Sequence, residues 1–144
     1  MKKMLIALPM LSAFCGLTTF PVLAAAPAPS GYLPYTPAAF EAARGERRVL
    51  FFHATWCPTC KAADTDIRAK LSELPRDVAL FKTDYDKEAA LKTQYGVTYQ
   101  HTFVLVDSAG KALKKWNGGS MADVLANLKP VNPKPVNPKP VSTK

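Results

Sequence analysis

The chain has 144 residues, which is enough to bury one hydrophobic core and too few for two ordinary domains. Its formal net charge of +8 at pH 7 would suit a nucleic-acid or anionic-membrane partner. However, two lysines in residues 1–3 and four in residues 129–144 carry most of that charge, and the middle of the chain keeps only +2. This distribution argues against a basic nucleic-acid-binding domain.

The first 24 residues have the three parts of a secretory signal peptide. Two lysines precede a mostly apolar stretch at 4–20, and small residues at 22–26 have the spacing that a signal peptidase needs. We expect cleavage after Ala24 or Ala26. The alternative is a retained membrane anchor, because about 17 apolar residues are near the lower limit for spanning a bilayer.

Cysteine usage agrees with export. Of the three cysteines, Cys15 lies in the predicted signal peptide, so the mature chain keeps Cys57 and Cys60. A bacterial periplasm is a compartment in which disulfides persist. We therefore expect a periplasmic protein.

The last residues, 129–144, repeat the sequence KPVNP, with proline at two of every five positions. Such a segment lacks backbone donors for a sheet and apolar bulk for a core, so it should be disordered, extended and solvated. We interpret it as a spacer or solubilising tail. The alternative is a basic arm that touches peptidoglycan, anionic lipid or a partner protein.

Between these ends, residues 25–128 alternate between strand and helix patterns. The predicted elements are, in chain order, a short strand at 32–35, a helix at 38–43 capped by Thr36, a strand at 49–53, a helix at 61–74, a strand at 78–83, a helix at 86–95 closed by Gly96, strands at 102–106 and 111–116, and a helix capped by Ser120 that ends at Leu128. The run at 49–53 does not alternate, which is typical of a strand buried on both faces. This order predicts a single α/β domain with a central mixed β-sheet flanked by helices.

The motif Cys57-Pro58-Thr59-Cys60 lies between a buried strand and a predicted helix. Two cysteines at this spacing can close a small disulfide ring, and the first faces the unpaired amides and positive end of the helix, which stabilise its thiolate. A thiolate is the species that attacks disulfides. We therefore predict that Cys57 is the nucleophile and that Cys60, one turn into the helix and more buried, resolves the mixed disulfide.

Two other interpretations of the cysteine pair are weaker. A structural disulfide across two residues would constrain the unfolded chain little. A structural zinc site would want a second pair of ligands, and only His53 and His101 remain as soft ligands.

Residues 49–119, with the preceding helix, resemble the thioredoxin superfamily. The similarity rests on the segment at 52–61, which reads FHATWCPTCK and includes the tryptophan before the first cysteine. It continues at 82–86, 95–97 and 107–119. The resemblance implies a thioredoxin-like fold and reversible thiol–disulfide exchange through a mixed disulfide, without a bound cofactor.

The sequence departs from the family pattern at two positions. Phe51 stands where the family usually carries a buried acid that deprotonates the resolving thiol. Proton transfer from Cys60 would then rely on water, on Lys82 or on His53. Lys82 has the alternative of a strand-end residue that extends its ammonium to solvent.

The second departure is His101, which stands where the family has a cis-proline. A cis bond before a non-proline residue costs about 2.5 to 4 kcal/mol, so we expect a trans bond. His101 could stabilise the Cys57 thiolate, act as acid or base, or ligate a metal with the two thiolates. By resemblance, Gln100 would pair its backbone with the substrate, and Trp56, Gln100, His101 and Thr102 would shape the docking surface.

Taken together, these patterns predict a monomeric periplasmic thiol–disulfide oxidoreductase that acts on disulfide-containing envelope proteins. The Pro-Thr pair between the cysteines and the lack of room for a helical insertion favour a reductase supplied by a membrane electron donor over a strong oxidant. One alternative is a copper or zinc delivery module that uses Cys57, Cys60 and His101. Another is an assembly factor dedicated to one client, such as a cytochrome or a secretion component.

Overall fold

The computed structural model describes residues 30–129, and five strands in it form one sheet in the order β1-β3-β2-β4-β5. The elements are, in chain order, β1 (Gly31–Pro34), α1 (Pro37–Ala42), β2 (Arg47–His53), α2 (Pro58–Ala69), a 3₁₀ turn (Leu71–Glu73), β3 (Val78–Asp84), α3 (Ala89–Tyr95), β4 (Thr102–Val106), β5 (Ala112–Asn117) and α4 (Met121–Leu128). The expected signal peptide with Cys15, and the tail at 130–144, lie outside the described residues.

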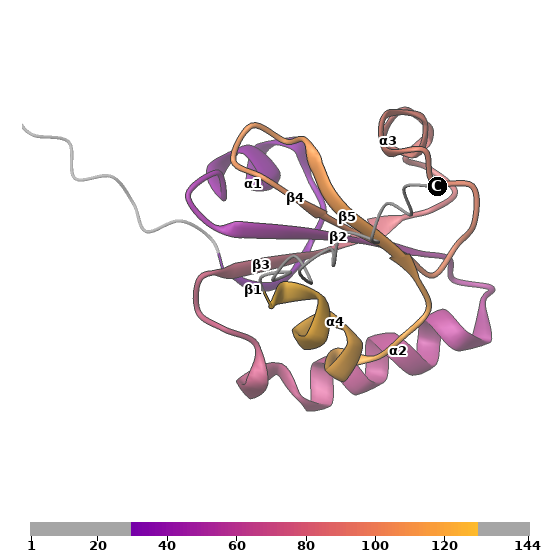
Figure 1. The fold of residues 1–144 in the computed structure, drawn as a ribbon. Coiled ribbons are helices and arrows are strands. Elements are labelled where there is room, and N and C mark those ends of the chain that lie inside the picture. The colour runs from indigo at the N-terminus through magenta and orange to yellow at the C-terminus, as the bar shows by residue number, and fades with distance from the viewer. Residues whose placement is uncertain (1–29, 130–144) are drawn as a thin grey trace, which may run out of the picture.

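The sheet is mixed, as predicted. Strands β1 and β2 run parallel to β3, whereas β4 runs antiparallel to both β2 and β5. Helices α2 and α4 cover one face of the sheet, and α1 and α3 cover the other (Figure 1). The predicted thioredoxin-like α/β fold is therefore confirmed.

The central strand β2 is buried on both faces, which explains its unbroken apolar run. Val49 and Phe51 point into the core under α2 and α4, and Leu50 and Phe52 point into the second core under α1 and α3. The dithiol begins four residues after the end of this strand, so a strand whose core residues are fully buried supports it.

Three elements differ by two or more residues from their predicted bounds. Helix α2 begins at Pro58 rather than residue 61 and ends at Ala69, after which the 3₁₀ turn brings Leu74 back into the core. Helix α3 begins at Ala89 rather than 86, because the Asp84 carboxylate accepts the backbone N–H groups of residues 86 and 87 in a turn that precedes the helix.

The third difference is at β2, which begins at Arg47 rather than residue 49. Arg48 is 1% exposed, and its guanidinium donates hydrogen bonds to the backbone oxygens of Phe40, Asp107 and Ser108. The sequence alone does not predict that a charged side chain is buried in the core. It can be buried here because these carbonyl groups meet its guanidinium.

Within residues 30–129, no helix combines the length and the apolar character that crossing a membrane requires.

Candidate functional site: a dithiol at the start of helix α2

The two cysteines of the motif lie where β2 ends and α2 begins. Cys57 is the N-cap of α2, and its sulfur accepts the backbone N–H of Cys60 at 3.3 Å. Pro58 takes the first helical position, where its missing N–H costs no hydrogen bond. Cys57 is 3% exposed and Cys60 is completely buried, and neither forms a disulfide in this structure.

The environment separates the pKa values of the two thiols. Burial acts to raise the pKa of Cys57, but hydrogen bonds from the Cys60 side chain, from Thr59 and from their backbone groups outweigh it, so the pKa is lowered. The Thr59 hydroxyl lies 3.1 Å from the Cys57 sulfur. Burial raises the pKa of Cys60 to about 11. Cys57 is therefore the better nucleophile of the two.

Trp56 stands beside the dithiol with 57% of its surface exposed. Its indole N–H donates a hydrogen bond of 3.0 Å to the carboxylate of Asp86, which follows β3. The sequence suggested no role for Asp86. The hydrogen bond shows that it orients the exposed tryptophan ring.

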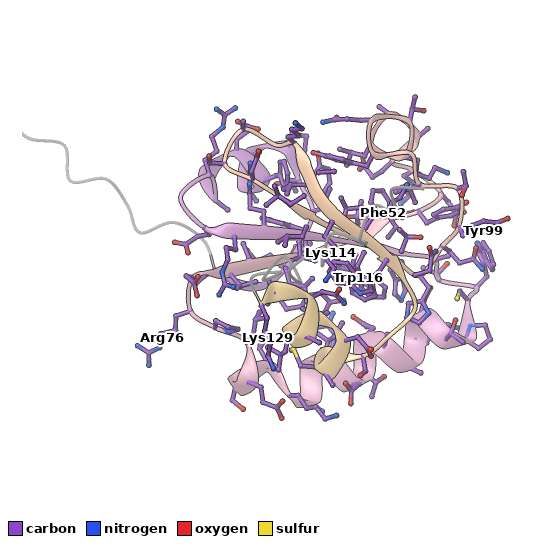
Figure 2. All side chains as sticks on the ribbon, viewed as in Figure 1. Phe52, Arg76, Tyr99, Lys114, Trp116 and Lys129 are labelled. Carbon is purple, nitrogen blue, oxygen red and sulfur yellow. The ribbon has the colours of Figure 1, made fainter. Side chains whose placement is uncertain are left out.

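The second segment that frames the dithiol is the loop before β4. Tyr99 in this loop is 68% exposed and projects from the edge of the molecule (Figure 2). Gln100 in the same loop is half-buried. Thr102 is buried, and its hydroxyl donates to the Tyr99 carbonyl and accepts from Asn117, so that hydroxyl holds the loop together.

His101 adopts an unusual backbone conformation. Residues 30–129 contain no cis peptide bond, as expected for His101, and His101 is the one non-glycine residue among them with a positive φ, at 60°. Its backbone N–H donates to the Phe52 carbonyl at 2.8 Å, and its carbonyl accepts from Gly118 at 2.7 Å. Such a strained residue is held by its surroundings and is typical of functional sites.

The imidazole of His101 is engaged by its neighbours. It packs near the rings of Phe51 and Phe103, and its Nε2 lies 3.1 Å from the Gly119 carbonyl. Because a carbonyl can only accept, Nε2 carries the hydrogen. His101 is one of the residues that line a hollow of about 350 Å³ beside α2.

A carboxylate that the sequence analysis missed lies one helical turn after Cys60. Asp64 accepts hydrogen bonds from Tyr32 at 2.6 Å, from Lys82 at 3.0 Å and from Arg68 at 3.3 Å. Burial acts to raise the pKa of Asp64, but these three donors outweigh it and lower the pKa to about 2. The spacing of four residues from Cys60 was the available signal, because it places two residues on one helix face.

Lys82, the predicted auxiliary residue, is therefore paired with Asp64 rather than extended freely into solvent. The neighbouring His53 is 6% exposed, and burial followed by the Lys82 charge lowers its pKa. It is a neutral imidazole at pH 7.

The site has no arrangement suited to a metal ion. Throughout residues 30–129, no group of three His, Cys, Asp or Glu side chains is placed to hold one, and Cys57, Cys60 and His101 are included in that finding. His101 cannot easily turn to the thiolates without losing its contact with Gly119.

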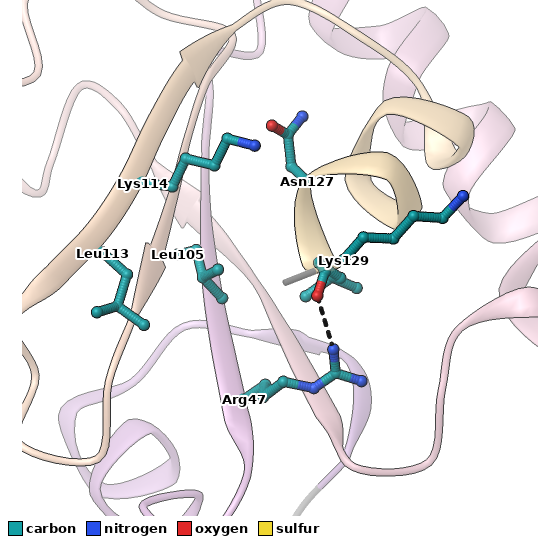
Figure 3. Close-up of a pocket in the computed structure, with 7 residues that line it drawn as sticks. Arg47, Leu105, Leu113, Lys114, Asn127 and Lys129 are labelled. Carbon is teal, nitrogen blue, oxygen red and sulfur yellow. Dashed lines mark hydrogen bonds between the residues drawn. The ribbon is translucent and has the colours of Figure 1, made fainter. Parts of the chain in front are cut away.

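A larger hollow, of about 520 Å³, lies away from the dithiol. It is formed by leucines of β4, β5 and α4 with Arg47 and Lys114 at its rim (Figure 3). Arg47 is the first residue of β2, whereas the dithiol follows the last, so this hollow and the dithiol lie at opposite ends of the strand.

Comparison with known proteins agrees with the geometry. The thioredoxin family model matches residues 34–129. Thioredoxin H3 of Arabidopsis thaliana is 30% identical over 81 residues, which are 56% of this chain and 67% of the plant protein. Thioredoxin-1 of Drosophila melanogaster is 33% identical over 66 residues, which are 46% of this chain and 62% of the fly protein. The matched segments thus span about two thirds of these relatives.

Solved structures show the same fold. Trxlp of Edwardsiella tarda has a TM-score of 0.56 and 29% identity, and the match covers 67% of this chain and 95% of that one. Thioredoxin of Fasciola hepatica has a TM-score of 0.56 and 26% identity, covering 67% and 94%. The chain belongs to the thioredoxin family, a family of thiol–disulfide oxidoreductases.

Proposed function

We propose that the protein is an exported reductase that exchanges disulfides with envelope proteins in the periplasm and receives its electrons from a membrane donor. The observation that carries the exchange chemistry is the pairing of a Cys57 thiol of lowered pKa with a fully buried Cys60. The thiolate of Cys57 attacks a substrate disulfide and releases one substrate thiol. Cys60 then attacks the Cys57 sulfur, releases the second thiol and leaves the Cys57–Cys60 disulfide.

Support for export comes from the sequence of residues 1–24, which has the charge and apolar pattern of a signal peptide. Expression of the full chain in a bacterium, followed by cell fractionation and mass spectrometry, tests it. We expect a periplasmic protein that begins after Ala24 or Ala26, and a cytoplasmic protein from the matched control that lacks residues 2–24. An uncut chain in the membrane would show an anchor instead.

The direction of exchange is tested by the reduction potential of the Cys57–Cys60 couple. A reductase should have a reduction potential well below that of the strong periplasmic oxidants, which is about −120 mV. A value above about −150 mV would contradict the assignment as a reductase.

The clients are found by trapping. In Cys60→Ser the resolving thiol is absent, so mixed disulfides on Cys57 should accumulate and can be identified after isolation. Cys57→Ser is the control and should trap nothing. Several trapped envelope proteins would indicate a general reductase, and a single one would indicate a dedicated assembly factor. If no protein is trapped, the exchange mechanism is overturned. The protein should be a monomer in solution throughout.

A further inference from the structure

Lys82 brings a positive charge to the face of the sheet that supports the dithiol. It pairs in register with Phe51 of β2, and Phe51 stacks on Phe103 with ring centroids 4.3 Å apart. The cross-strand neighbour of Lys82 on β2 is therefore apolar, and the carboxylate that pairs with its ammonium belongs to another element, helix α2.

Helix α2 supplies that charge through Asp64. The Asp64 carboxylate is 18% exposed and the Lys82 side chain 32% exposed, so solvent screens this pair less than an ordinary surface ion pair. The Tyr32 hydroxyl from β1 donates to the second oxygen of the same carboxylate at 2.6 Å. Asp64 thereby joins β1, β3 and α2 at one point.

This point lies next to the resolving thiol. Asp64 follows Cys60 by four residues, which is one helical turn on the same face. Tyr32 packs against the same apolar core as Cys60. The other charged or titratable side chains around this pair are His53, Asp84 and the exposed Arg68.

We propose that Asp64 is a positioning residue for thiol–disulfide exchange: one helical turn from the buried thiol, it neutralises Lys82 and thereby keeps the dithiol strongly reducing. An unpaired ammonium on this face of the sheet would stabilise the Cys57 thiolate, because Cys60, with a pKa of about 11, stays protonated at neutral pH. It would thereby make the disulfide easier to reduce. An unpaired carboxylate would act in the opposite sense. The ion pair cancels both effects.

The equilibrium with glutathione measures how the charges of Asp64 and Lys82 affect the reduction of the Cys57–Cys60 disulfide, and it needs no client protein. The protein disulfide and two glutathione thiols convert to the protein dithiol and glutathione disulfide, so that two electrons and two protons move to the protein. Asp64→Asn leaves the Lys82 charge unpaired. We expect the equilibrium constant for reduction to rise by about three- to tenfold, because one pKa unit of thiolate stabilisation corresponds to tenfold.

Two further variants test the sign of the effect. Lys82→Met leaves the Asp64 charge unpaired and should lower the same equilibrium constant. The double variant Asp64→Asn/Lys82→Met removes both charges and should return it to within about twofold of the original value. The matched control is Asp77→Asn, which breaks the ion pair with Arg47 at the far end of β2 and should leave the constant unchanged.

A merely structural role for Asp64 predicts a different result. In that case Asp64→Asn and Asp77→Asn would both lower thermal stability and neither would move the glutathione equilibrium, which would overturn the proposal. Shifts of the same sign in Asp64→Asn and Lys82→Met would also overturn it. If Asp64→Asn does not fold, Lys82→Met alone still tests the direction.

Discussion

The backbone N–H of Cys60 donates a hydrogen bond to the sulfur of Cys57, and the Thr59 hydroxyl reaches the same sulfur from within the motif. Both donors favour the thiolate of Cys57 over its thiol. Thr59, in the middle of the motif, therefore affects the chemistry of the nucleophile directly.

Removing the Thr59 hydroxyl should make Cys57 less reactive. In Thr59→Val one donor to the thiolate is lost, so the pKa of Cys57 should rise by up to about one unit and its alkylation at pH 7 should slow by up to about tenfold. The measurement is the rate of iodoacetamide alkylation of each cysteine against pH, read by mass spectrometry. Cys60, whose pKa is about 11, should remain unmodified at neutral pH.

The control for this experiment is Thr65→Val. The Thr65 hydroxyl donates to the backbone oxygen of Lys61 within α2 and does not touch the dithiol. An equal slowing of alkylation in both variants would show that the Thr59 hydroxyl has no special effect on Cys57.

Freeing the Trp56 ring should weaken the reaction with protein substrates. In Asp86→Ala the indole loses its 3.0 Å acceptor, and the exposed ring gains freedom that docking must remove. Because a hydrogen bond of ordinary net strength is lost, we expect kcat/KM for insulin reduction to fall by about two- to tenfold in Asp86→Ala. The glutathione equilibrium should not change.

Lys87→Ala is a suitable comparison, because Lys87 is an exposed neighbour of Asp86 that does not contact the tryptophan. If Asp86→Ala reduces insulin as fast as Lys87→Ala, Asp86 does not assist docking.

Proline at position 101 should destabilise this fold. The φ of His101 is 60°, whereas proline requires about −65°, and proline has no N–H to donate to the Phe52 carbonyl. We expect His101→Pro to lose about 3 kcal/mol or more of the free energy of unfolding, as measured with urea. His101→Asn should lose less, because asparagine tolerates a positive φ. A proline variant as stable as the asparagine variant would show that the loop simply rearranges.

Much of the fold could be predicted because its signals are local. The unbroken apolar run at 49–53, the positive φ of Gly96 after α3 and the cysteine spacing each depend on a few adjacent residues. The dithiol, its place at a helix start and the trans bond at His101 followed from such local chemistry.

What could not be predicted depends on contacts between distant segments. Lys82 could be singled out, but the choice between a free ammonium and an ion pair required knowing that α2 crosses β3 at Asp64. In the same way, the hydrogen bond between Trp56 and Asp86 joins residues thirty positions apart. No periodicity along the chain encodes either contact.

Arg48 offers a test of stability that is separate from the redox chemistry. Its buried guanidinium donates to three backbone oxygens and lies 4.2 Å above the ring centroid of Phe40, which links α1 to the turn between β4 and β5. Arg48→Met keeps much of the volume but leaves these carbonyls without their donor. We expect a loss of about 2 to 4 kcal/mol in the free energy of unfolding.

Arg48→Lys should fall between the original protein and Arg48→Met, because an ammonium keeps the charge but cannot reach the same set of carbonyls as the planar guanidinium. Because Arg48 lies at the opposite end of β2 from the dithiol, the glutathione equilibrium of both variants should match that of the original protein. Urea unfolding and the glutathione equilibrium, measured on the same samples, separate the two effects. A shifted equilibrium in Arg48→Met would show that the cores on the two faces of the sheet are coupled through β2.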